Sequence, residues 1–179
     1  MGILYYPNRL LTTPTKDLVP HLGIPILPVG LKDELLLTAV ERRAVGLAAN
    51  QIGGDSSVVL LSLPGETSRL LINPRVVEKS KQTRFAEEAC LSLPGITVTI
   101  LRHDWVVVKY RNEQDSEVEE TFKGFAARVA EHEIDHLNGL LIFHHVPLVT
   151  RHQLLAKMRK AKRVERASLR LVEKMGVRR

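Results

Sequence analysis

Two histidines one helical turn apart, with a glutamate beside the first, are the residues of this sequence best suited to chemistry. The run His132-Glu133-Ile134-Asp135-His136 places both imidazoles on one face of a helix, as two ligands of a tetrahedral metal ion require. Glu133 then lies beside the ion, where a carboxylate can accept a proton from water. The motif therefore predicts a hydrolytic metal centre.

Two histidines are too few for such a centre, and the third ligand distinguishes the enzyme classes. Metzincin peptidases carry it six residues beyond the second histidine, where this chain has Ile142. Thermolysin-like enzymes use a downstream glutamate, but the glutamates after His136 lie in a basic C-terminal segment. Three downstream histidines remain open as ligands, although each is better interpreted as a surface or strand-end residue: His144, His145 and His152.

The single cysteine, Cys90, is the better candidate for the third ligand. A lone cysteine cannot form an internal disulfide, which fits a reducing cytoplasm and leaves the thiol free for other chemistry. Its neighbours Glu87, Glu88, Ser92 and Pro94 are not those of an ordinary apolar strand.

Two helices are expected around these residues. Residues 32–43 carry Leu35, Leu36, Ala39 and Val40 on one stripe, and Gly46 marks a natural end for that helix. Helical periodicity resumes over residues 125–137, so the two motif histidines belong to a helix with its own apolar stripe.

Short β-rich runs fill the chain between these helices. Apolar and threonine residues alternate from Ile96 to Ile100, which gives one buried and one polar face, and Gln114-Asp115-Ser116 is typical of a hairpin tip. The fold class predicted is α+β, with small, mainly antiparallel sheets around a central metal-binding helix and a long C-terminal helix. The strands expected cover residues 57–62, 69–73, 96–101, 105–111 and 118–123.

Length and composition favour a single domain over residues 1–179, and the metal motif would make it the catalytic domain. A chain of 179 residues with 44% hydrophobic residues can fill one core. The longest uncharged stretch, residues 18–31, contains three prolines and cannot span a bilayer as a helix. We therefore expect no membrane association, no export signal and a cytoplasmic location.

The basic charge of the chain is concentrated at its C-terminus. Residues 151–179 hold 11 Lys and Arg against 2 acids, whereas the whole chain carries a net charge of +6. Apolar residues at helical spacing run through this segment, so residues 148–179 are expected to form one basic helix. Charge alone leaves two interpretations open: a solvated helix face, or a site for an anionic partner such as RNA.

Three motifs together resemble those of the peptide deformylase family, in the same order and with the same spacing, over roughly residues 5–165. They are Gly46-Leu47-Ala48-Ala49-Asn50-Gln51, Glu88-Ala89-Cys90-Leu91-Ser92 with Pro94, and the histidine run. Enzymes of this family remove the formyl group from the N-terminal methionine of nascent chains and release formate. The resemblance implies Fe²⁺ as the metal in the cell, with Zn²⁺, Ni²⁺ or Co²⁺ as possible substitutes.

The resemblance also implies roles for individual residues. Cys90, His132 and His136 would bind the metal, Glu133 would be the acid and base, and Gln51 with the backbone N–H of Leu91 would donate to the oxyanion. The substrate would be held by Val45, Gly46, Glu88, Ala89, Phe125, Arg128 and Val129. This chain has alanine where the family has glycine at positions 44 and 89, and the added methyl groups could crowd the substrate. Arg128, one turn before His132, is expected to pair with Glu88 and to line the methionine pocket with its methylene stem.

The resemblance gives the partners as well. Formylmethionyl nascent peptides are the expected substrates, and the basic helix is the expected contact with the ribosome. Two other functions stay open at this point: a catalytically weak or silent ribosome-associated relative, and a metalloprotease acting on ordinary peptide bonds.

Overall fold

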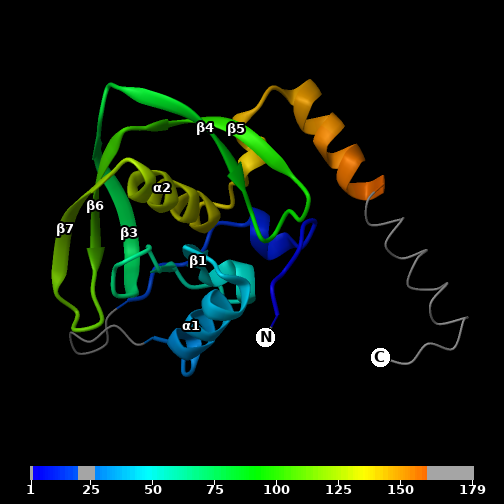
Figure 1. The fold of residues 1–179 in the computed structure, drawn as a ribbon. Helices are drawn as coiled ribbons and strands as arrows, with labels where there is room; N and C mark the ends of the chain where they lie inside the picture. The colour runs from blue at the N-terminus through cyan, green and yellow to red at the C-terminus, as the bar shows by residue number, and fades with distance from the viewer. Residues whose placement is uncertain (1, 20–26, 161–179) are drawn as a thin grey trace, which may run out of the picture.

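The computed structural model describes residues 2–19 and 27–160 (Figure 1). The elements follow in the order η1 (Arg9–Thr12), α1 (Leu31–Arg42), β1 (Gly46–Ala48), η2 (Ala49–Ile52), β2 (Val58–Leu61), β3 (Arg69–Lys79), β4 (Thr83–Ala89), β5 (Thr97–His103), β6 (Trp105–Arg111), β7 (Glu117–Lys123), α2 (Phe125–Leu137) and η3 (Ile142–His145). Residues 148–160 form a further helix. The predicted α+β class is confirmed.

All strand pairs within the two sheets are antiparallel. The larger sheet has the order β1-β2-β3-β6-β7, and β4 pairs with β5 in a separate two-stranded sheet. β1 and β4 therefore each leave one edge without a strand partner in the described chain. β4 was not predicted, because Thr83–Ala89 is polar and largely exposed, without the apolar alternation by which sequence reveals a strand.

Helix α2 packs its apolar side against the larger sheet. Ala127, Val129, Ala130, Ile134 and Leu137 join a buried cluster with strand residues such as Val106 and Phe122. The helix begins and ends where the periodicity predicts. Its other side faces β4 and β5, so α2 lies between the two sheets (Figure 1).

Helix α1 ends differently from the prediction. Arg43, not a glycine, adopts the left-handed conformation after the last turn, with φ 52° and ψ 41°. Gly46 lies three residues further on, inside β1. The reason for a glycine there is steric and belongs to the active site, described below.

The C-terminal helix is confirmed over residues 148–160. Met158 is buried, and Leu154 and Leu155 pack against the same cluster as Phe143, whose ring also lies 5.0 Å from the Arg151 guanidinium. The helix lies on the opposite side of the molecule from β7 (Figure 1). The rest of the expected helix, residues 161–179, lies outside the described residues.

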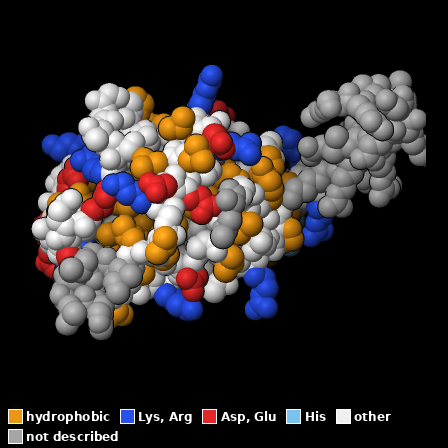
Figure 2. Space-filling view, turned by 90° about the horizontal axis from the view of Figure 1, so that it is seen from below, with side chains coloured by type: hydrophobic (Ala, Val, Ile, Leu, Met, Phe, Trp, Pro, Cys, Tyr) orange, Lys and Arg blue, Asp and Glu red, His pale blue; other side chains and the backbone are white. Residues whose placement is uncertain are grey.

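Within the described ranges, no helix combines the length and the apolar character that crossing a bilayer requires. Seen from below, hydrophobic side chains lie between positive and negative ones, and neither sign of charge dominates this face (Figure 2).

The turn after α2 depends on Gly139, and its replacement provides a test of the fold. Gly139 has φ 72°, and a Cβ there would lie 2.9 Å from the Thr12 carbonyl carbon. We expect Gly139→Ala to lower the free energy of unfolding by about 2 kcal/mol or more in urea titrations. Gly65→Ala is the matched control, because Gly65 has φ 78° but no neighbour within 4 Å, so it should cost only about 1 kcal/mol. Equal losses would show that the contact with the N-terminal segment is unimportant.

Candidate active site

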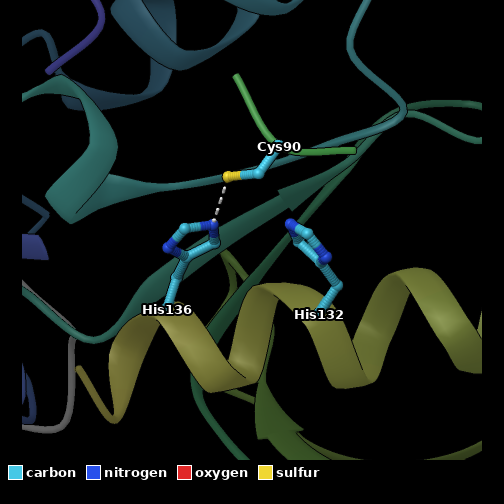
Figure 3. A group of neighbouring side chains, drawn as sticks. All are labelled: Cys90, His132 and His136. Carbon is cyan, nitrogen blue, oxygen red and sulfur yellow. Dashed lines mark hydrogen bonds between the residues drawn. The ribbon is translucent and has the colours of Figure 1, made fainter. Parts of the chain in front are cut away.

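Cys90, His132 and His136 converge at one point. One possible ligand atom from each lies within 4.8 Å of the other two, and Cys90 Sγ lies 3.1 Å from His136 Nε2. The two imidazoles project side by side from α2 toward the thiol (Figure 3). One sulfur and two imidazole nitrogens form a donor set that suits Zn²⁺ and other first-row divalent ions.

Helix α2 and the end of β4 bring the three residues together. The two histidines are neighbours because residues four apart in a helix share a face. Cys90 follows directly after β4, and its side chain is buried in an apolar cluster with Leu93 and Ile96. Two of the three potential ligands are therefore close together in the sequence, and only the thiol comes from a distant segment.

The two histidines change the acidity of the Cys90 thiol. Burial would raise the pKa of the Cys90 thiol, but the charge of His136 and the hydrogen bonds from both histidines outweigh it and lower the pKa to about 5. Burial likewise opposes the charged form of His132, yet hydrogen bonds with Cys90 and Glu88 raise its pKa well above the usual value. A thiolate is the form of cysteine that binds metal ions.

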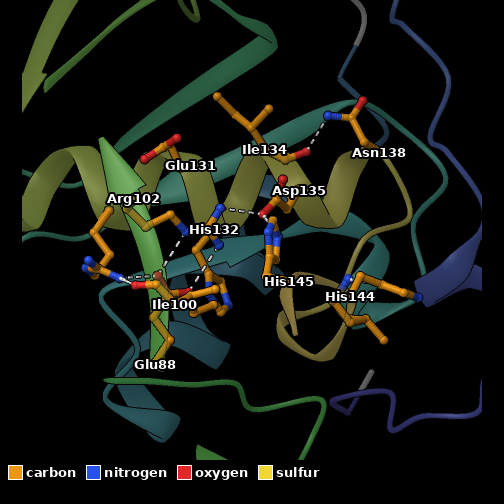
Figure 4. A network of polar contacts seen from close by, with 12 residues as sticks. Glu88, Ile100, Arg102, Glu131, His132, Ile134, Asp135, Asn138, His144 and His145 are labelled. Atoms are coloured by element: carbon orange, nitrogen blue, oxygen red, sulfur yellow. Dashed lines mark hydrogen bonds and ion pairs between the residues drawn. The ribbon is translucent and has the colours of Figure 1, made fainter. Parts of the chain in front are cut away.

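The Glu88 carboxylate fixes the ring of His132 (Figure 4). Glu88 Oε2 lies 2.8 Å from His132 Nδ1, which leaves Nε2 directed toward Cys90. Arg102 donates to both carboxylate oxygens, at 2.9 and 3.1 Å, and Arg128 donates to Oε1 at 2.7 Å. Although burial raises the pKa of Glu88, the hydrogen bonds and charges of His132 and Arg102 lower it to about 2, so the residue stays ionised. In metal sites, a ligand histidine commonly donates its other ring N–H to a carboxylate, and this hydrogen bond orients the ring.

The predicted ion pair between Arg128 and Glu88 is therefore present, and Arg102 was missed. Arg102 is buried on β5 and also donates to Asp135 Oδ2 at 2.6 Å. It occupies the next buried position after Val98 and Ile100. An arginine at a position where the alternation of a strand predicts a buried apolar residue indicates a buried ion pair. Arg102 could have been identified from the sequence in this way.

Glu133 lies next to the potential ligands and is almost fully buried. Its Oε2 atom is buried with no hydrogen-bond partner among the described residues. Burial raises the pKa of this carboxyl, and the positive charges of His132 and His136 offset only part of that effect. A Cβ on Gly46 would lie 2.6 Å from Glu133 Oε1, so only glycine fits at this position of β1.

Gln51 directs its amide nitrogen at the same point. Its Oε1 accepts a hydrogen bond of 2.9 Å from the Ala48 N–H, which fixes the orientation of the amide. Its Nε2 donates to Ser92 Oγ at 3.3 Å and lies 3.8 Å from Cys90 Sγ. Ser92, which the sequence marks only as a neighbour of Cys90, therefore accepts a hydrogen bond from the Gln51 amide.

A cleft of about 530 Å³ opens over these residues. The residues proposed from the sequence all line this cleft except His136, which contacts Cys90 in the cluster of potential ligands. Neither Ala44 nor Ala89 has a positive φ, so the alanines fit the backbone at these two positions. Glu87 and Pro94, named above only as neighbours of Cys90, also line the cleft, and the lining residues that the sequence did not indicate are Tyr5, Arg42 and Arg43.

The downstream histidines left open as ligands do not reach this cluster. His145 Nε2 lies 2.7 Å from Asp135 Oδ2, and His144 Nδ1 accepts a hydrogen bond from the Leu141 N–H. Among the described residues, the only group suited to hold a metal ion is Cys90, His132 and His136.

Comparisons with known proteins agree with this geometry. The family model for polypeptide deformylase matches residues 1–152. Curated peptide deformylases include that of Thermotoga maritima, 39% identical over 149 residues that cover 76% of this chain and 90% of the relative. The relative from Aquifex aeolicus is 36% identical, with coverage of 77% and 82%.

Solved structures give the same result. Peptide deformylase from Legionella pneumophila matches with a TM-score of 0.80 and 30% identity over 92% of this chain and 96% of that one. A peptide deformylase from Acinetobacter baumannii, described as bound to Met-Ala-Ser, matches with a TM-score of 0.75 and 29% identity, covering 82% and 98%. With its fold, its cluster of potential ligands and its relatives in agreement, the chain belongs to the polypeptide deformylase family and has the hydrolase activity of that family.

Proposed function

We propose that this cleft binds the formylmethionyl end of a nascent polypeptide, and that Glu133, Gln51 and Leu91 carry out its hydrolysis to formate and a free amino terminus. The observation that carries this proposal is the buried Glu133 carboxylate, whose Oε2 has no hydrogen-bond partner in the described part of the chain and lies beside Cys90, His132 and His136. A buried acid without a partner costs stability, and such a cost is typical of a catalytic group.

Cys90, His132 and His136 would hold one divalent metal ion, which we propose to be Fe²⁺ in the cell. The residues fit such an ion, since three donor atoms are gathered in one place and the lowered pKa of the thiol favours its ionised form. When bound, the ion supplies Lewis acidity toward water and toward the formyl carbonyl. Three protein ligands also leave a coordination position open, as catalytic sites require.

Glu133 would move the proton. Burial raises its pKa above that of an exposed glutamate, which makes the carboxylate a better proton acceptor. The carboxylate takes a proton from the attacking water and then delivers it to the nitrogen of the leaving amine. The burial of Glu133 keeps bulk water from competing in this transfer.

Gln51 and Leu91 would stabilise the oxygen that becomes negative as the formyl carbon turns tetrahedral. The Gln51 amide is already fixed by Ala48, so its Nε2 need not reorganise during the reaction. The backbone N–H of Leu91, which follows Cys90 on the cleft wall, would be the second donor.

The methionine side chain would lie in the apolar part of the cleft. Val45, Val129 and Phe125 line this part, together with the stem of Arg128, whose guanidinium is held by Glu88 and by the Arg84 carbonyl. Gly46 on β1 and Ala89 on β4 lie along the two strand edges at the cleft. An extended peptide could therefore hydrogen-bond to backbone on either side, as in strand addition.

Replacement of the carboxylate tests its proposed role. Glu133→Gln keeps the shape of the side chain and removes the proton acceptor, so formate release from formyl-Met-Ala-Ser should fall at least ~10²-fold. Elemental analysis should still find one metal ion per chain. Glu119→Gln, which removes an exposed carboxylate of β7, should stay within about twofold of the parent protein. A metal-replete Glu133→Gln protein with parental activity would contradict the mechanism.

The basic C-terminal helix would bring the enzyme to the ribosome in the cytoplasm. The helix packs through Leu154 and Met158 and leaves Lys157, Arg159 and Lys160 exposed. A row of cations is attracted to RNA phosphates in a salt-dependent way, and the whole segment 151–179 carries a net charge of +9.

Truncation tests whether the C-terminal segment serves ribosome binding without taking part in catalysis. Removal of residues 163–179 should reduce co-sedimentation with ribosomes at low salt and leave the hydrolysis of a short formyl peptide nearly unchanged. A full-length variant with the Lys and Arg of this segment changed to Gln controls for length. Unchanged co-sedimentation of both variants would assign the segment a purely structural role.

A further inference from the structure

We propose that Arg42 and Arg43 form a cationic rim on the cleft that selects formylated chains carrying Asp or Glu shortly after the methionine. This inference rests on the proposed function, because it names the class of substrate that the same cleft prefers. It concerns the residues that enter the cleft behind the methionine, which do not take part in the chemistry.

The position of the two arginines carries the first part of the argument. Both line the cleft, on the segment that leads from α1 into β1. Along this wall Ala44, Val45 and Gly46 are half-buried, whereas Arg42 and Arg43 are exposed. The wall therefore changes from apolar to cationic on the way out of the cleft. A peptide with its formyl group at the metal ligands and its methionine against the apolar wall must pass this rim.

The charges at the rim are available to a ligand. Within the described ranges, neither Arg42 nor Arg43 has a carboxylate within ion-pair distance. Arg128, by contrast, is held by Glu88 and by backbone carbonyls, so the third arginine of the cleft is occupied. On the opposite wall, Glu87 is the one exposed acid among the described lining residues, and the rim of two arginines keeps an excess of positive charge.

The backbone holds this pair in place. Arg43 has φ 52° and its N–H caps the end of α1 on the Ala39 and Val40 carbonyls, while the Ala44 N–H donates to Ala39 O at 2.9 Å. Glycine is the residue that normally adopts this conformation at low cost. An arginine fixed on a helix end loses less freedom on binding than one on a loose loop.

The guanidinium group determines the ligand chemistry. Two adjacent arginines present planar donor forks that match a carboxylate, and they repel a lysine at the same place. Contacts at the exposed rim do not change as the formyl carbon reacts, so they should act on substrate binding and therefore on KM.

A peptide series tests the proposal on the metal-loaded full-length protein. The substrates are formyl-Met-Ala-Asp-Ala, formyl-Met-Ala-Ser-Ala and formyl-Met-Ala-Lys-Ala, all amidated so that no terminal carboxylate is present. We expect kcat/KM for the Asp peptide to exceed that for the Lys peptide by about tenfold at low salt, mainly through KM. In 0.5 M NaCl the ratio should fall to within about twofold.

Three variants show whether the arginines cause this preference. Arg42→Gln/Arg43→Gln should abolish it, and Arg42→Glu/Arg43→Glu should reverse it in favour of the Lys peptide. Lys79→Gln/Lys81→Gln removes the same net charge from exposed residues that do not line the cleft, and should keep it. Equal kcat/KM for the three peptides with the parent protein would overturn the cationic rim while leaving deformylation intact. A parent protein that released no formate from any of them would overturn the proposed function, and the rim with it.

Discussion

The buried carboxylate of Glu88 is the interaction on which the site depends. Its side chain is 5% exposed, and it receives hydrogen bonds from Arg102 on β5 and from Arg128 and His132 on α2. A buried charge is tolerated only when such partners surround it, and removal of one partner leaves the others uncompensated. Glu88 thus ties the small sheet to the central helix, and Cys90, two residues further along the chain and just past the end of β4, is placed opposite the histidines as a consequence.

The polar groups of this region divide into two sets with different purposes. The set around Glu88 is hydrogen-bonded to Arg102, Arg128 and His132. The other set includes Glu133 Oε2 and His136 Nδ1, which are buried without a partner in the described protein. Buried polar atoms are normally satisfied, so exceptions gathered beside a cluster of potential ligands indicate a ligand-binding place. The close contact between Gly46 and Glu133 shows how little room the fold leaves for movement there.

Features encoded by local spacing could be predicted from the sequence. Helix α2 and the pair His132 and His136 follow from helical periodicity, and Cys90 was identified because the chain has a single thiol. Strand β4 was missed because its residues are polar and its stability comes from pairing with β5. Tyr5 enters the cleft only through tertiary folding, because it is distant in sequence from every motif. Arg42 and Arg43 precede the first motif, but the direction in which they leave the end of α1 is set by tertiary structure and not by a periodic pattern.

X-ray absorption spectroscopy of the metal-loaded protein tests the central claim most directly, because it counts the sulfur and nitrogen ligands without relying on turnover. With Zn²⁺ or Ni²⁺ bound, Cys90, His132 and His136 predict one sulfur at about 2.3 Å and two imidazole nitrogens at about 2.0–2.1 Å for zinc. Cys90→Ser should remove the sulfur contribution. A parent protein with one bound metal ion per chain and no sulfur in its coordination shell would contradict the account.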